Sequence, residues 1–396
     1  MRHQAGFLVS ILFLTAACAG GDAAGEGPEV VRRDSAGVAV VESRGGDRPL
    51  DWSFQEVLRL GGADDGPEAF YQPTVATDAR GRIYVLDRGE HRVSVFDTAG
   101  RHLRTFGREG GGPGELQMPG QLAVTADGVV AVQDWGKHAL VRWDSAGQPI
   151  EQFRLRSPML YDLRSVGARL AGEYVTMAGF GETADSTRHT LTFLSADEND
   201  STAVARAAVA PGREIDLGCV RIGSMAPLFQ PDLAWGVAGD RFVIADGAAY
   251  ELELRDGRGE LQGLVRRDVA PTASTLELAT REVGDSMRVT FGGGRGCAAA
   301  PDKVVEQRGY AETVPAVRSV VGAPGGGWWV FRGVGERDAQ TMDVFAADGA
   351  YVGTLPADAP HPQTFLSDDL LVTIERDEFD LPYVVVYRIV REPAED

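Results

Sequence analysis

Residues 81–106 read GRIYVLDRGEHRVSVFDTAGRHLRTF, and residues 128–153 repeat that stretch as GVVAVQDWGKHALVRWDSAGQPIEQF. A shift of 47 positions superimposes the two stretches without a gap, from Gly81 on Gly128 to Phe106 on Phe153. Each stretch contains two β-rich runs, an Asp-x-x-Gly turn and a further short β run. A repeat of this period is typical of an array of small β units.

The loop that leads into each unit repeats as well. Its glycines and prolines recur at an offset of 46, so that Gly61, Gly66, Pro67 and Pro73 correspond to Gly107, Gly112, Pro113 and Pro119. Weaker copies of the unit follow at residues 173–194, 241–257, 328–349 and 370–389. The chain therefore contains six units, which predicts an all-β fold.

The two ends of the array are complementary. The last unit has no strand after Ile389, whereas residues 57–60 form a β-rich run with no unit before it. If this N-terminal run pairs with residues 383–389, the array closes into a ring and leaves no open sheet edge. We therefore predict a six-bladed β-propeller over residues 51–392.

The strand pattern breaks between the fourth and fifth units. Ser274 and Glu277 form a capping box, and helical spacing follows at Leu276, Ala279, Val283 and Met287. A glycine-rich loop comes next at residues 292–296. Residues 272–312 are thus predicted to be a helical and loop insertion between blades four and five, lying across one end of the ring. Residues 29–50 are predicted to form an additional N-terminal hairpin, because β-rich runs stand on both sides of the turn residues 34–37.

Residues 57–153 resemble the NHL repeats of six-bladed β-propellers. The resemblance rests on the glycine and proline loops at Gly61 and Gly107, on DARGRIYVLD at 78–87 and on RVSVFDTAG at 92–100. The layout, including RRDSAGV at 32–38, is similar to that of exported bacterial propellers. Propellers serve as enzymes, receptors and scaffolds, so the resemblance implies a fold and leaves the activity open.

The N-terminus has the pattern of an export signal. Arg2 and His3 precede a short apolar run at residues 7–14, too short to span a bilayer. Residues 14–18, LTAAC, resemble the lipobox of bacterial lipoproteins, although Thr15 stands where leucine is usual. This resemblance predicts a signal peptide at 1–18, lipidation of Cys18, a flexible tether at 19–28 and anchoring to the cell envelope, in the outer membrane or periplasm. An ordinary signal peptide and a secreted protein are the alternative.

Charge and cysteine usage narrow the class of protein. The chain has 58 acidic and 39 basic residues, a net charge of -19 and no basic stripe, which argues against nucleic-acid binding. Beyond Cys18 there are only Cys219 and Cys297, an even pair that predicts a disulfide in an oxidising compartment. Two free thiols are the alternative. The two cysteines lack the spacing of a zinc site.

Familiar catalytic motifs are absent from the sequence. It contains no G-x-S-x-G elbow, S-x-x-K, H-E-x-x-H or Walker loop, so no catalytic residue is assigned. His91 and His138 hold equivalent places in adjacent units, each four residues after an aspartate, and they could share a metal or a ligand. Trp135 in the same loop would suit ligand stacking. These three residues are the candidate ligand-binding residues.

Two functions remain open at this stage. The first is a binding module, without catalysis and expected to be monomeric, that presents its loops to a protein, a glycan or a small molecule. The second is an enzyme of the lyase or lactonase kind with its site at the central channel. The calcium lactonases among six-bladed propellers hold their metal with acids and asparagines, and the only asparagine here is Asn199. No cofactor is therefore predicted, and Ca²⁺ is the alternative.

Overall fold

The computed structural model describes residues 29–63, 66–155, 160–176, 187–194, 203–209, 212–247, 249–290, 296–333 and 341–391. The predicted signal peptide with Cys18, the tether, Asn199 and most of the glycine-rich loop lie outside these residues. No helix among them is long and apolar enough to cross a membrane.

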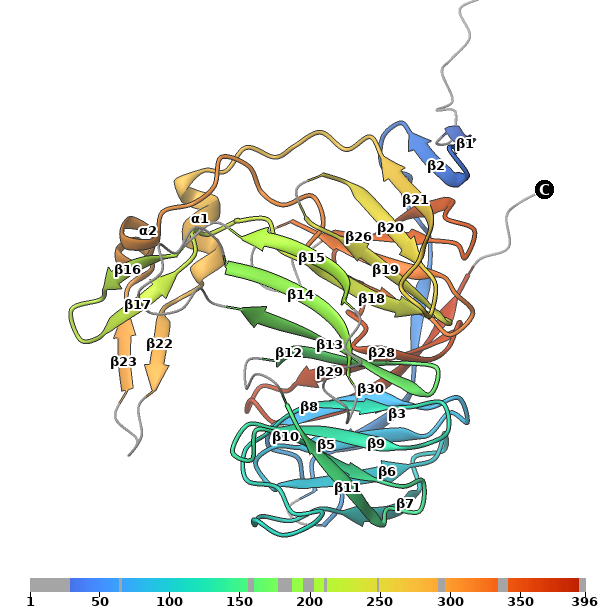
Figure 1. Cartoon of the computed structure of the whole chain (residues 1–396), viewed down its shortest axis with the longest axis vertical. Coiled ribbons are helices and arrows are strands. Elements are labelled where there is room, and N and C mark those ends of the chain that lie inside the picture. Colours follow the sequence, from blue (N-terminus) through green and yellow to red (C-terminus); the bar gives the residue numbers. More distant parts are fainter. Residues whose placement is uncertain are drawn as a thin grey trace, which may run out of the picture.

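Six antiparallel sheets form a ring, which confirms the predicted six-bladed propeller (Figure 1). The blades, each given from its inner to its outer strand, are as follows. Blade one contains β4 (Pro73–Thr77), β5 (Ile83–Asp87), β6 (Arg92–Phe96) and β7 (His102–Phe106), and blade two contains β8 (Pro119–Val124), β9 (Val130–Asp134), β10 (Ala139–Trp143) and β11 (Pro149–Arg154). Blade three contains β12 (Leu160–Val166), β13 (Arg169–Thr176), β14 (Thr187–Leu194) and β15 (Ala203–Val209), and blade four contains β18 (Ala234–Ala238), β19 (Arg241–Ala245), β20 (Glu251–Arg255) and β21 (Leu261–Arg267). Blade five contains β24 (Ser319–Gly322), β25 (Trp328–Arg332), β26 (Thr341–Phe345) and β27 (Tyr351–Leu355), and blade six contains β28 (Thr364–Ser367), β29 (Leu370–Arg376), β30 (Pro382–Val390) and β3 (Ser53–Gly61).

The second strand of each blade is apolar on both faces because another blade covers each face. In β5, Tyr84 and Leu86 pack against blade two, whereas Ile83 and Val85 pack against blade six. A strand buried on both faces loses the simple alternation of polar and apolar residues, as residues 83–86 do. Trp328 and Trp329 follow the same rule in β25, since they are buried in different clusters on opposite faces of the strand.

The repeated Asp-x-x-Gly motif builds the turn between the third and fourth strands. Asp97 Oδ1 accepts hydrogen bonds from the backbone N–H groups of Ala99 and Arg101, and Gly100 has a φ of 79°. Asp144 and Gly147 repeat this geometry in blade two. The aspartate satisfies the amides of the turn, and the glycine supplies a positive φ that other residues rarely adopt.

The ring closes as predicted, through the N-terminal strand. β3 is the outer strand of blade six and pairs antiparallel with β30, with Leu60 opposite Val384 and Ser53 opposite Val390. The other blades take all four strands from one continuous stretch of chain. Closure therefore depends on residues from opposite ends of the sequence.

The N-terminal segment also contacts blades four and five. β1 (Glu29–Ser35) and β2 (Val38–Arg44) form a hairpin, and β2 pairs in parallel with β21, the outer strand of blade four. Farther along, Thr354 on β27 of blade five donates its N–H to the Arg48 carbonyl and accepts the N–H of Leu50. Residues 29–61 thus run along three consecutive blades before the first continuous blade begins.

The predicted insertion between blades four and five is present and contains α1 (Leu276–Val283), β22 (Met287–Thr290), β23 (Gly296–Ala299) and α2 (Pro301–Arg308). The N-cap of α1 is Thr275 and not the predicted Ser274, because the Thr275 side chain accepts the N–H of Leu278. The sequence did not indicate that a second hairpin, β16 (Arg213–Asp216) with β17 (Arg221–Met225), joins this unit from between blades three and four.

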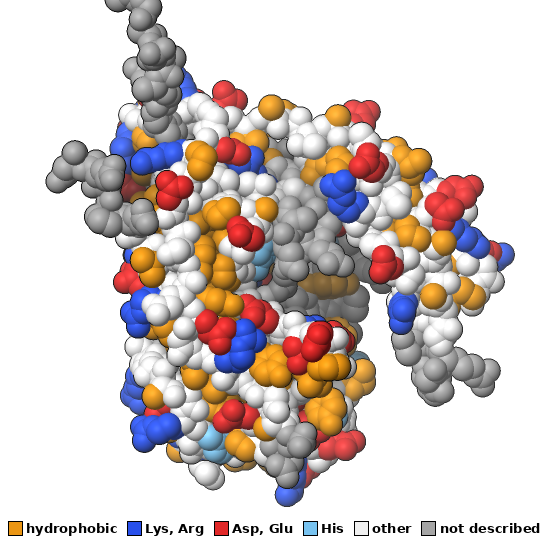
Figure 2. Space-filling model, turned by 180° about the vertical axis from the view of Figure 1, so that it is seen from behind, with side chains coloured by type: hydrophobic (Ala, Val, Ile, Leu, Met, Phe, Trp, Pro, Cys, Tyr) orange, Lys and Arg blue, Asp and Glu red, His pale blue; other side chains and the backbone are white. Residues whose placement is uncertain are grey.

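A disulfide between Cys219 and Cys297 links the two hairpins across a separation of 78 residues, so the predicted pairing is confirmed. The combined unit stands off from one end of the ring beside the upper blades instead of lying flat across it (Figure 1). Figure 2 shows a hollow between this unit and the lower part of the ring.

Candidate functional site at the insertion face

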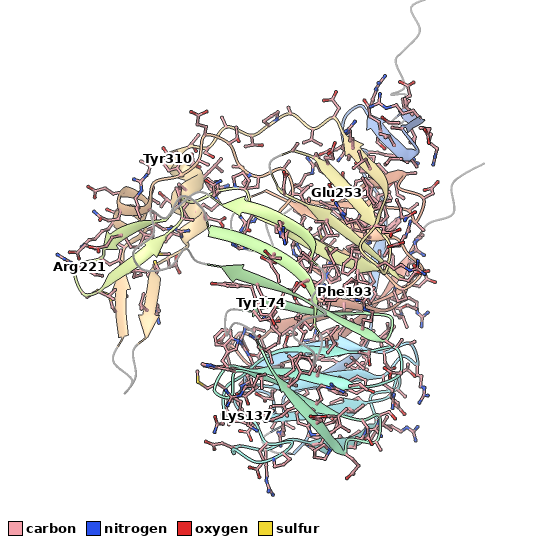
Figure 3. All side chains as sticks on the ribbon, in the orientation of Figure 1. Lys137, Tyr174, Phe193, Arg221, Glu253 and Tyr310 are labelled. Carbon is pink, nitrogen blue, oxygen red and sulfur yellow. A yellow bond between two sulfur atoms is a disulfide. The ribbon has the colours of Figure 1, made fainter. Side chains whose placement is uncertain are left out.

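One end of the ring carries every candidate residue. In each blade the loop before the inner strand and the loop between the second and third strands lie at the same end, because the strands are antiparallel. Both parts of the insertion leave and rejoin the ring through loops that precede inner strands. We call this end the insertion face. Figure 3 labels Lys137 and Tyr174, both on the side of the ring from which the insertion projects.

The repeated aspartates hold the loops of this face. Asp87 is buried and accepts the backbone N–H groups of Tyr71, Gln72 and Gly89. Asp134 does the same in blade two, with the N–H groups of Gln117, Met118 and Lys137. A buried carboxylate that accepts three amides fixes the conformation of its loop. These two aspartates therefore have structural partners for their oxygens.

The repeated histidines occupy the left-handed position of the same loops. His91 has a φ of 56° and His138 a φ of 52°, a conformation that histidine adopts more readily than most residues. The His91 Nε2 atom lies 3.1 Å from the carbonyl oxygen of Gln117, so this ring ties blade one to the loop of blade two. His138 is exposed. Among the described residues, no hydrogen bond joins the two rings.

Exposed apolar side chains gather on this face. They come from blades one, two, three and six, and they are Tyr71, Met118, Trp135, Tyr161, Phe379 and Leu381, with exposed fractions from 47% for Leu381 to 75% for Phe379. We call this set the apolar rim. The Trp135 indole lies close to the inner strand of blade two, since a Cβ added at Gly120 would be 3.1 Å from its Nε1. Figure 2 shows hydrophobic and acidic side chains mixed where the lower blades border the hollow.

The central channel has a cavity volume of about 510 Å³ and is lined by the inner strands of all six blades. The lining is polar in part, with Thr74, Gln121, Asp162, Arg164, Asp240 and Gln363 among its residues. The inner strands of blades four and five approach closely, and a Cβ at Gly322 would lie only 1.9 Å from the Val237 carbonyl oxygen. A glycine is required there for the blades to pack.

Three potential ligand residues meet at the junction of blades three and four. His189 Nδ1 on β14 lies 2.5 Å from Glu173 Oε1 on β13 and 2.9 Å from Oδ1 of Asp232, which precedes β18. Glu173 and His189 are buried, whereas the Asp232 side chain is half exposed. Trp235 Nε1 donates to the other Glu173 oxygen at 3.1 Å. The cluster therefore joins blades three and four.

Burial and charge act in opposite directions on this cluster. Burial raises the pKa of Glu173, against the hydrogen bond from His189. Burial would lower the pKa of His189, but its hydrogen bonds with Asp232 and Glu173 prevail and raise that pKa to about 9. The imidazole is thus a cation at neutral pH when nothing else neutralises the carboxylates. Tyr161, a member of the apolar rim, has its ring centroid 6.2 Å from that of His189.

A second cavity, of about 470 Å³, lies between the ring and the insertion. Asp232 lines it together with Leu228, Glu282, Val304, Arg308 and Arg318. Arg318 pairs with Glu282 of α1 through two hydrogen bonds of 2.7 and 2.8 Å, which fixes the helix to blade five. Asp232 therefore connects the buried cluster with an open cavity.

Sequence reasoning missed this cluster because its members come from three elements with no local motif. The sequence feature that could have indicated the cluster is a charged residue inside an apolar strand, as Glu173 is in β13. The residues predicted from sequence, Trp135, His91 and His138, also lie on the insertion face. Among the described residues, however, neither histidine belongs to a group of three side chains that could hold a metal ion.

Comparison with known proteins supports the fold. Residues 72–167 match the model of a family described as a 6-bladed beta-propeller, DUF5128. The NHL-repeat protein E3 ubiquitin-protein ligase NHLRC1 of Rattus norvegicus is 37% identical over 68 residues, which is 17% of this chain. This chain spans only 17% of that relative's length.

Two solved structures align with most of this chain. A Bacteroides fragilis protein predicted to be exported aligns over 89% of this chain and 99% of its own, with a TM-score of 0.50 and 10% identity. Virginiamycin B lyase from Staphylococcus aureus aligns over 85% of this chain and 99% of its own, with a TM-score of 0.39 and 11% identity. At 10% identity, the likeness to the B. fragilis protein shows the propeller fold alone. The chain is a six-bladed β-propeller with NHL-like repeats.

Proposed function

We propose that the protein is a binding module of the cell envelope that contacts a partner protein through the apolar rim. The main support for this proposal is that the six apolar side chains of the rim are exposed on one face of four blades. Five of its six residues are Tyr, Trp, Phe or Met, the types enriched in protein interfaces. Exposed apolar residues gathered on one face commonly mark an interaction site.

The location outside the cytoplasm is part of this proposal. It is supported by the export pattern of residues 1–18, by the disulfide, which persists in oxidising compartments, and by the likeness to a protein predicted to be exported. Cys18 would carry the lipid, with a secreted form as the alternative. Cys18→Ser should abolish lipid labelling and move the protein to the soluble extracytoplasmic fraction. A wild-type protein that is already unlabelled and soluble would contradict the anchor.

Site-specific photo-cross-linking in the native cell tests the partner contact. A photoreactive residue at Trp135 or Met118 should give a discrete cross-linked species, and Tyr71→Ala with Phe379→Ala should abolish it. The control position is Leu103 on β7, which is similarly exposed at 45% but belongs to an outer strand. Equal products from Leu103, or none from the rim, would refute the proposal.

The Glu173–His189 pair favours a second candidate, an enzyme with its site beside the cavity between the ring and the insertion. An imidazole held by a carboxylate beside a cavity is an arrangement that general acid–base catalysis uses. A lyase or a lactonase would need this pair for turnover. The binding module would keep its cross-link in His189→Gln, whereas the enzyme would lose its activity, so the same variant separates the two.

A further inference from the structure

The cluster at the junction of blades three and four has the composition of a metal site. Glu173, His189 and Asp232 each offer one ligand atom, and these three atoms lie within 4.8 Å of one another. We infer that the three residues bind one divalent transition-metal cation, Zn²⁺ by preference. This inference is independent of the partner contact proposed above, because no residue of the apolar rim belongs to the ligand set.

The donor atoms select the kind of cation. One imidazole nitrogen with two carboxylate oxygens suits Zn²⁺, which accepts nitrogen and oxygen ligands at about 2.0–2.2 Å. Ca²⁺ and Mg²⁺ prefer oxygen ligands alone, and Ca²⁺ takes six to eight of them. Within the described residues this is the one group of three such side chains close enough to share an ion.

The geometry calls for a positive charge at the centre of the cluster. Both carboxylates point at the same nitrogen atom, His189 Nδ1, at 2.5 and 2.9 Å. Whether neutral or protonated, the imidazole has at most one N–H at that atom, which cannot serve two acceptors equally well. At tetrahedral angles the bond lengths of zinc place its ligand atoms about 3.3–3.6 Å apart. Moving the Glu173 oxygen about 0.8 Å and the Asp232 oxygen about 0.4 Å farther from the nitrogen would admit the ion.

The surroundings orient the ligands and leave a way in. Trp235 Nε1 holds the second oxygen of Glu173, and the backbone N–H of Leu233 lies 2.6 Å from Asp232 Oδ1. Such outer contacts commonly fix the ligands of a metal. The Asp232 side chain lines the cavity of about 470 Å³, which provides an entry path and room for water or an external ligand. Three protein ligands with an open position are typical of zinc sites that bind or activate a further ligand.

Calorimetric titration of ZnCl₂ into the purified, EDTA-treated protein tests the inference. We expect one Zn²⁺ per chain, with at least about a hundredfold loss of affinity in His189→Gln and in Asp232→Asn, and a loss of about tenfold in Trp235→Phe. Asp232→Asn is the safest variant for folding because that side chain is half exposed. Circular dichroism should show that each variant retains its strand content.

His138→Gln is the matched control, since it removes an exposed histidine of the same face. Zinc affinity should be unchanged in this variant. The inference is overturned if the wild type takes up no stoichiometric Zn²⁺, if His189→Gln and Asp232→Asn bind as the wild type does, or if binding is lost in His138→Gln instead.

Discussion

Replacing Asp343 by asparagine should destabilise the ring more than any change at the surface of blade five. Asp343 lies on β26, is fully buried and accepts four hydrogen bonds. One oxygen accepts from Arg267 and from the Tyr250 hydroxyl, each at 2.7 Å. The other accepts from the Thr354 hydroxyl at 2.6 Å and from Arg332 at 3.3 Å. The network thus joins blade four to blade five.

The expected loss of unfolding free energy in Asp343→Asn follows from the charges around that carboxylate. Arg267 is 1% exposed, and both Arg267 and Arg332 pair with Asp343 and with Asp47 of the N-terminal segment. Two cations are balanced by two anions. Asparagine would leave one positive charge in excess and could place an amide donor against guanidinium donors. Removing one partner of a buried ion pair costs about 3–5 kcal/mol, and asparagine adds no cavity term because it keeps the volume.

Urea unfolding followed by tryptophan fluorescence provides the assay, with refolding checked for reversibility. Asp348→Asn is the matched control, in the turn between β26 and β27 of the same blade. Asp348 pairs with Arg32 at the surface, and asparagine can keep its hydrogen bond to the Ala350 N–H. That variant should lose less than about 1 kcal/mol of unfolding free energy.

A double variant isolates the charge effect. Adding Arg267→Met to Asp343→Asn removes the uncompensated cation. The double variant should therefore lose less unfolding free energy than the sum of the two single variants, by about 1–3 kcal/mol. If Asp343→Asn unfolds within about 1 kcal/mol of the wild type, or if the double variant is strictly additive, the buried network does not stabilise the blade junction as reasoned.

Two further predictions concern closure and the insertion. Deleting residues 19–45 should leave a folded, soluble ring with a lower melting temperature, because the β2–β21 pairing and the Arg32–Asp348 ion pair are lost while β3 still closes the ring. Deleting residues 19–61 should cause precipitation because it also exposes the edge of β30, and equal calorimetric stability of the two truncations would contradict closure through β3. Replacing both Cys219 and Cys297 by serine should lower the free energy of unfolding of the insertion by up to about 4 kcal/mol, because the disulfide spans 78 residues. Amide hydrogen exchange should then rise in α2 and β16 while the blades stay protected, and unchanged exchange in the insertion would show that packing alone stabilises it.

The ring could be predicted from sequence because its information is local and repeated. Asp97 and Asp144 make the same turn, and the β-rich run at residues 57–60 matches the strand that the last unit lacks. The candidate metal cluster could not be predicted in this way. Glu173 and His189 meet only through the pairing of β13 with β14, and Asp232 joins them only when blade four packs on blade three. The β16–β17 hairpin was missed for a related reason, since its partner helix α2 lies in a different connection of the chain.

The path of residues 29–61 along blades four, five and six sets an order for assembly. These residues are made before all of their partners, which are β21, Thr354 and β30. During synthesis the N-terminal segment must therefore stay unpaired while blades one to three form, and contacts of such long sequence separation are slow to close. If Cys18 carries a lipid as proposed above, the unpaired β3 would be held at the membrane surface. The ring would then close at the membrane, once β30 has been made.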